Sequence, residues 1–137
     1  MINKYSFMVF IFLILFSIFV TNCSDDEDKE TLVGTWVLTS MKMTSLGFTV
    51  TMDPAEMGIS MRLTVRSDNS YTMVMTEDDV TTTSNGEWAT SGGKLFITEE
   101  GDTEEYDYSL KGDKLEVSFE EIEEGQTVTI TQVFTRQ

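Results

Sequence analysis

From residue 32 to the end of the chain, apolar and polar residues alternate with a period of two. In the clearest run, residues 59–66, the odd positions hold Ile, Met, Leu and Val, and the even positions hold Ser, Arg, Thr and Arg. Residues 71–76, 115–120 and 127–134 repeat the pattern with few exceptions. Successive side chains of a strand point to opposite faces of a sheet. The alternation therefore predicts an all-β protein built from half-buried antiparallel strands.

Turn-forming residues separate these runs and leave room for eight or nine strands. The turn signals are Ser67-Asp68-Asn69, Asp78-Asp79, Asn85-Gly86, Gly92-Gly93, Gly101-Asp102, Gly112-Asp113 and Glu124-Gly125. Sequential hairpins of this number close most simply into an up-and-down β-barrel, because closure removes exposed edges. The interior of an eight-stranded barrel is filled by side chains or holds one small ligand.

The segment 46–58 is expected to hold the second strand and one helical turn. Residues 46–52 fit a strand with Phe48 and Val50 pointing inward. Asp53 can cap a helical turn, since a proline follows it at the first helical position, and Gly58 can end that turn.

Composition excludes several classes of function. The chain has 137 residues, which predicts one domain, and it contains no histidine. Its one cysteine, Cys23, allows no intrachain disulfide. Without histidine, the usual catalytic triads and zinc sites lack their base and their ligand, so we expect no enzyme activity, no metal and no cofactor. A formal charge of −15 repels phosphate backbones, so nucleic acid is not an expected partner.

The first residues are typical of an export signal. Residues 1–22 contain Lys4 followed by an apolar run at 7–20, which predicts a signal-peptide helix; an uncleaved anchor is the alternative. Residues 20–23, Val-Thr-Asn-Cys, resemble a bacterial lipobox, with Asn22 in place of the usual small residue. The resemblance implies that fatty acids such as palmitate are attached to Cys23 and anchor the chain to a membrane.

Residues 23–31 are expected to form an acidic, hydrated tether. The run Ser-Asp-Asp-Glu-Asp at 24–28 also resembles the acidic tract that directs Bacteroidetes-type lipoproteins to the cell surface. This resemblance implies an exported protein on the outer membrane, exposed at the surface.

Several motifs in residues 32–137 resemble a known family. Residues 32–38 contain Gly34-Thr35-Trp36, which resembles the Gly-x-Trp opening of the lipocalins and of bacterial lipocalin-like lipoproteins. Residues 63–71, 86–88 with 94–98, and 110–115 resemble later hairpins of that family in the same order. The resemblance implies that Trp36 closes one end of the barrel and that Arg136, from the last strand, packs on it.

The residues expected to point into the barrel are rich in methionine and aromatic groups. The cavity candidates are Phe48, Met52, Met61, Tyr71, Met73, Met75, Tyr106 and Tyr108. Methionine repacks around varied shapes, and together with the resemblance this favours a small hydrophobic or amphipathic ligand. The alternative is that these side chains fill the barrel, and that the protein acts as a surface interaction or envelope scaffold through its acidic outer face.

Adjacent acidic pairs do not suggest a catalytic site. Glu99-Glu100, Glu104-Glu105 and Glu123-Glu124 are neighbours in sequence, and neighbouring strand residues face opposite ways. The two carboxylates of one pair therefore cannot flank one glycosidic bond. The acidic stretch 99–107 also lacks the ligand spacing of a calcium-binding loop.

Overall fold

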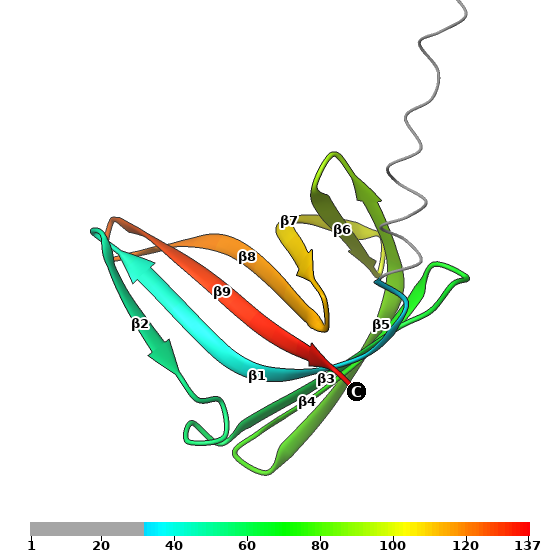
Figure 1. Cartoon of the computed structure of the whole chain (residues 1–137), viewed down its shortest axis with the longest axis horizontal. Helices are drawn as coiled ribbons and strands as arrows, with labels where there is room; N and C mark the ends of the chain where they lie inside the picture. The colour runs from blue at the N-terminus through cyan, green and yellow to red at the C-terminus, as the bar shows by residue number, and fades with distance from the viewer. Residues whose placement is uncertain (1–31) are drawn as a thin grey trace, which may run out of the picture.

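The computed structural model describes residues 32–137, so the expected signal peptide, Cys23 and the acidic tether lie outside the described residues. The described part contains nine antiparallel strands (Figure 1). They are β1 (Gly34–Ser45), β2 (Phe48–Met52), β3 (Ile59–Val65), β4 (Ser70–Glu77), β5 (Val80–Ser91), β6 (Lys94–Glu99), β7 (Asp102–Lys111), β8 (Lys114–Glu123) and β9 (Gln126–Arg136).

Eight of the strands close into a barrel. Strands β3 to β9 pair consecutively, and β1 pairs with β3 on one edge and with β9 on the other. The remaining strand, β2, pairs with β1 and with no other strand of the described chain. The all-β, up-and-down barrel predicted from the alternation is therefore confirmed, with one strand outside the closed ring.

β2 and β3 share the same edge of β1. Residues 41–45 of β1 pair with β2, and residues 34–37 pair with β3. A tight turn at 54–58 joins the two short strands, in which the Asp53 carboxylate accepts a hydrogen bond from the Ala55 N–H at 2.9 Å. β2 begins at Phe48 rather than at Leu46, because Leu46 and Gly47 adopt positive φ angles of 51° and 80° in the hairpin turn.

One expected turn is wrong. Asn85 and Gly86 lie inside β5, at the point where this strand leaves β4 and begins to pair with β6. A Cβ on Gly86 would lie 2.1 Å from the Thr98 carbonyl oxygen and 2.9 Å from the Tyr71 ring. The glycine is therefore explained by close approach of neighbouring groups rather than by a turn.

The tightest packing lies at the end of the barrel where β1 begins. Trp36, Leu32 and Leu115 are almost fully buried there. The Trp36 Nε1–H donates to the Leu32 carbonyl at 2.9 Å, so the buried indole is satisfied. Further core residues are Leu38, Met61, Leu63, Val65, Tyr71, Trp88, Leu95, Val117 and Phe134. We call this end the closed end.

At the opposite end, part of the wall extends beyond the ring. β7 pairs with β8 only as far as Ser118, whereas β8 and β9 remain paired to their hairpin at 123–126. β2, with residues 42–45, 120–123 and 126–130, therefore forms a sheet that continues beyond the paired length of β7; we call it the extension. In Figure 1 the β1–β2 and β8–β9 hairpins project together to one side.

Candidate ligand cavity

The closed end is sealed by the two residues that the resemblance assigns to it. The Arg136 guanidinium carbon lies 4.2 Å from the centre of the Trp36 ring. The Arg136 side chain also donates a hydrogen bond to the Val33 carbonyl at 2.8 Å. A guanidinium held over an indole face stabilises this packing by cation–π attraction. The closed end of the barrel is therefore filled by side chains, and any ligand space lies between this seal and the opposite end.

A cavity of about 240 Å³ lies inside the barrel, between this seal and the opposite end. Its walls are mostly apolar, with two tyrosines, two glutamates and one glutamine among them. The lining residues are Met61, Leu63, Tyr71, Met73, Leu95, Ile97, Glu99, Glu104, Tyr106, Val117, Phe119, Gln132 and Phe134. They come from β3, β4 and β6 to β9, so most of the ring contributes to one site.

Two tyrosine–carboxylate pairs line this cavity. The Tyr71 hydroxyl donates to Glu99 Oε2 at 3.3 Å, and the Tyr106 hydroxyl donates to Glu104 Oε2. Burial raises the pKa of Tyr71, and Glu99 raises it further. Burial and the hydrogen bond to Glu104 raise the pKa of Tyr106 well above its ordinary value. Both phenols therefore stay protonated at neutral pH and act as donors to the carboxylates.

An aromatic contact supports the Tyr106 side of the cavity. The rings of Tyr106 and Phe119 meet edge to face, with centroids 5.9 Å apart and planes at 87°. Such pairs are stabilised beyond their buried area. The contact fixes the position of the Tyr106 hydroxyl, and with it the position of the Glu104 carboxylate.

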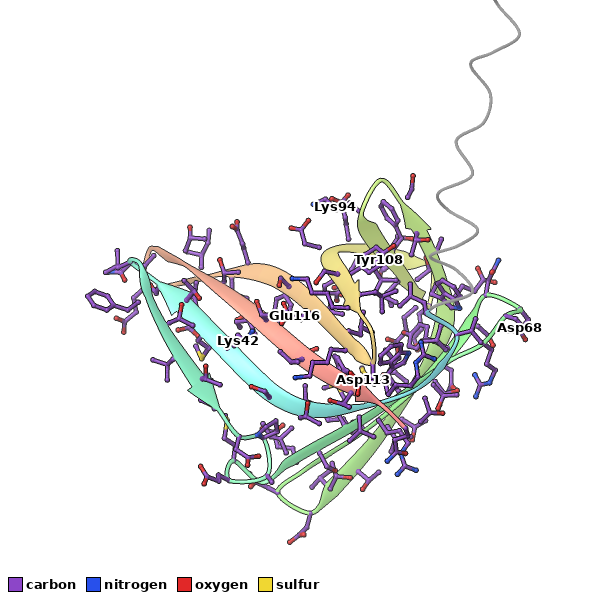
Figure 2. The ribbon with its side chains drawn as sticks, in the orientation of Figure 1. Lys42, Asp68, Lys94, Tyr108, Asp113 and Glu116 are labelled. Carbon is purple, nitrogen blue, oxygen red and sulfur yellow. The ribbon has the colours of Figure 1, made fainter. Side chains whose placement is uncertain are left out.

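The outer face of the wall is held by polar contacts that do not reach the cavity. Lys42 of β1 and Glu116 of β8 form an ion pair of 3.1 Å across β9 (Figure 2). Lys94 of β6 pairs with Asp107 at 2.8 Å and with Glu105 at 3.2 Å, both on β7. Because these groups are substantially exposed, they contribute little to stability.

The cavity candidates separate into three groups. Met61, Tyr71, Met73 and Tyr106 line the barrel cavity. Of the other candidates, Phe48 and Met52 lie in the extension, and Met75 and Tyr108 pack against the core.

Phe48 and Met52 are outside the barrel. They line a broad, open hollow of about 720 Å³ on the inner face of the extension, together with Val50. Phe48 is 79% exposed and Val50 is 58% exposed. Their side chains do point to the inner face, as the alternation predicts, but no opposite wall covers that face. The prediction that they belong to the barrel interior is wrong for this reason.

Met75 and Tyr108 line neither hollow. Both pack against the hydrophobic core cluster as partly buried side chains, and Tyr108 lies on β7 near the middle of the molecule in Figure 2. The alternation predicts their inward parity, and they contribute to the core packing rather than to the cavity wall.

The alternation also contains a signal for the two glutamates. Glu99 shares parity with Leu95 and Ile97, and Glu104 shares parity with Tyr106. Neighbouring residues face opposite ways, so one member of each acidic pair faces inward. Glu99 and Glu104 are the members that enter the barrel wall.

Within residues 32–137, no three carboxylate, thiol or imidazole side chains converge as metal ligands would. None of the helical segments in the described part of the chain has the length and apolar character that a membrane crossing requires.

Comparison with known proteins supports the fold. The family model of the lipocalin-like domain matches residues 32–117, which is more than half of the chain. No curated protein sequence matches the chain. The match begins with the segment that carries Trp36 and includes most of the cavity wall. The chain therefore belongs to the family of lipocalin-like domains.

Proposed function

We propose that this protein is a membrane-anchored lipoprotein whose barrel binds one small hydrophobic or amphipathic ligand. The observation that carries the ligand-binding part is the cavity of about 240 Å³ above the Trp36–Arg136 seal. A water molecule occupies about 30 Å³ in the liquid, so the space is several times larger than one water. The lipocalin-like family is in general a binding fold rather than a catalytic one, which agrees with the absence of histidine from the sequence.

The chemistry of the wall favours an apolar ligand body. Met61 and Met73 lie among aliphatic and aromatic side chains from several strands, and thioethers adapt to varied shapes. Typical small-molecule sites have volumes of roughly 300–1,000 Å³. The cavity lies just below that range, so it suits a ligand no larger than a single ring with a short arm.

A cavity-filling substitution tests the binding. Val117 lies in the cavity wall and is almost fully buried, so Val117→Phe places a ring in the ligand space. We expect binding of 2-phenylethanol, followed by calorimetry, to fall by at least about tenfold. Val80→Phe is the matched control, since Val80 is 64% exposed at the β4–β5 hairpin. Equal affinities in both variants would contradict binding in the barrel, provided that both melt cooperatively.

The anchoring part rests on Cys23, which follows the apolar run of residues 7–20. Acyl chains on this cysteine would hold the barrel at a membrane through the acidic segment 24–28. We further propose the outer membrane surface as its location, on the resemblance of that acidic segment to a surface-sorting signal.

Metabolic labelling tests the anchor. In a bacterial host fed with alkyne-tagged palmitate, the wild-type chain should acquire the tag and Cys23→Ala should not. Digestion of intact cells by added protease then tests surface exposure. A tagged protein that survives digestion until the outer membrane is opened would contradict the surface location and leave the anchor supported.

A further inference from the structure

The barrel cavity has apolar walls but carries two carboxylates on one side. Glu99 of β6 and Glu104 of β7 both line it. Glu104 pairs with Ile97, two residues from Glu99, so the two glutamates are diagonal cross-strand neighbours. Such neighbours are roughly 7–8 Å apart. A positively charged group can therefore contact both carboxylates at once.

No cation of the described chain neutralises these carboxylates. The cavity wall contains neither Lys nor Arg. The ion pairs formed within residues 32–137 involve Glu116, Glu105 and Asp107, and neither Glu99 nor Glu104 takes part in one. Two like charges at one site repel each other, and a cation bound between them removes that repulsion.

The two carboxylates are held in place and keep acceptor capacity. Each receives a hydrogen bond from a tyrosine, Glu99 from Tyr71 and Glu104 from Tyr106. A carboxylate offers about four lone-pair sites, so each can accept further hydrogen bonds from an ammonium group. The Tyr106 and Phe119 rings stand beside the same space, and aromatic faces attract cations.

From these observations we infer that the barrel selects an amphipathic amine, with an ammonium head between Glu99 and Glu104 and an apolar body against Met61, Met73 and Leu95. The inference rests on the proposed function and adds the charge of the ligand. The large negative charge of the chain also draws cations toward the molecule in general. The test must therefore separate the effect of these two glutamates on amine affinity from the effect of the net negative charge.

Three probes of similar shape separate head-group charge from apolar fit. They are 2-phenylethylamine, which is cationic at pH 7, 2-phenylethanol, which is neutral, and phenylacetate, which is anionic. Each is titrated by calorimetry into the full chain in lipid nanodiscs, with empty nanodiscs subtracted. We expect the amine to bind at least about tenfold more tightly than the alcohol, and phenylacetate to bind most weakly, because the two carboxylates attract a cation and repel an anion.

The decisive variant is Glu99→Gln with Glu104→Gln, which removes both charges and keeps the shape. We expect the amine to lose its advantage, so that the ratio of the amine and alcohol affinities falls to within about threefold. Both glutamates are exposed at the cavity mouth, so the variant should fold. The matched control is Glu87→Gln with Glu120→Gln, which changes the net charge equally. These two side chains have outward parity on β5 and β8, and the control should keep the preference for the amine.

The outcomes distinguish the two proposals. If the alcohol binds and wild type shows no preference for the amine, the choice of an amine is overturned and the binding function stands. If the preference survives Glu99→Gln with Glu104→Gln, or disappears equally in the control variant, the assignment to these two glutamates is overturned. If none of the three probes binds, the proposed binding function fails and the inference fails with it.

Discussion

The two ends of this barrel are made from the same alternating strands but differ in what faces them. At the closed end, Trp36 is fully buried, and Arg136 covers its ring. At the extension, Phe48 lies on the inner face of the sheet and remains 79% exposed. The difference is not in the residue pattern, which is apolar in both places. It arises because β2 has no partner beyond β1, and because β7 stops pairing with β8 at Ser118.

The comparison shows that inward parity and burial are separate properties. Alternation determines which face of the sheet a side chain occupies. Whether that face is covered depends on strands that are distant in sequence. At the closed end the ring is complete, so apolar side chains stabilise the fold through burial. At the extension Phe48 and Val50 remain in contact with water and contribute little.

Substitution of one aromatic residue at each end gives the largest expected difference in the free energy of unfolding. Trp36→Ala should lower the free energy of unfolding by about 3–5 kcal/mol, because it removes the largest fully buried side chain of the core. Phe48→Ala should change it by less than about 0.5 kcal/mol, since the ring is exposed. Urea denaturation followed by tryptophan fluorescence through Trp88 measures both. Equal losses would remove the distinction between the two ends.

Gly86→Ala sharpens the comparison from within the wall near the closed end. The added methyl group would meet the Thr98 carbonyl at 2.1 Å, and a backbone oxygen cannot rotate away as a side chain does. We expect a loss of roughly 1–3 kcal/mol from this overpacking. Ser84→Ala on the same strand, which has the same inward parity, is the control and should have a smaller effect. A Gly86→Ala melt identical to wild type would show that the strands there are more loosely packed than described.

The seal itself can be weakened without removing the tryptophan. Arg136→Ala removes the cation over the Trp36 ring and the hydrogen bond to the Val33 carbonyl. We expect a loss of about 2 kcal/mol, and a smaller loss for Arg136→Lys, which keeps the charge but not the planar guanidinium. Thermal melts of the two variants measure this order. If the lysine variant is as unstable as the alanine variant, the charge contributes nothing to the seal.

The smallest expected effect concerns the cavity mouth at high pH. The pKa of Tyr106 is raised in the fold by burial and by Glu104. The folded chain therefore holds this proton to a higher pH than the unfolded chain does. The resulting stability is present below pH ~10 and is lost as the pH rises above that value. Tyr106→Phe should show a shallower fall in melting temperature between pH 9 and pH 11. An unchanged slope would show that the hydroxyl is not buried against the carboxylate.

Much of the barrel was predictable because its rules are local. The alternation predicts the strands, and the Gly34-Thr35-Trp36 motif indicates that Trp36 seals the closed end. The family resemblance then suggested Arg136, which the structure places against that tryptophan.

The rest depended on contacts between distant segments. Asn85-Gly86 has the composition of a turn, and the neighbouring residues give no sign that the Thr98 carbonyl lies beside Gly86. The alternation predicts Phe48 in the barrel interior, because the sequence does not show where β7 stops pairing with β8. Glu99 and Glu104 carry the right parity, but acidic side chains at the wall of a mostly apolar cavity are not expected until that cavity is seen.

Methionine methyl groups test most directly whether the ligand binds inside the barrel, since methionines lie in the barrel cavity, in the extension and in an exposed turn. Met61 and Met73 line the barrel cavity, Met43 and Met52 line the hollow of the extension, and Met57 is exposed in the turn before β3. In a methyl-labelled full chain in nanodiscs, saturation with 2-phenylethylamine should shift the NMR signals of Met61 and Met73 and leave that of Met57 unchanged. Shifts confined to Met43 and Met52, or no shift at any methionine, would contradict a ligand site inside the barrel.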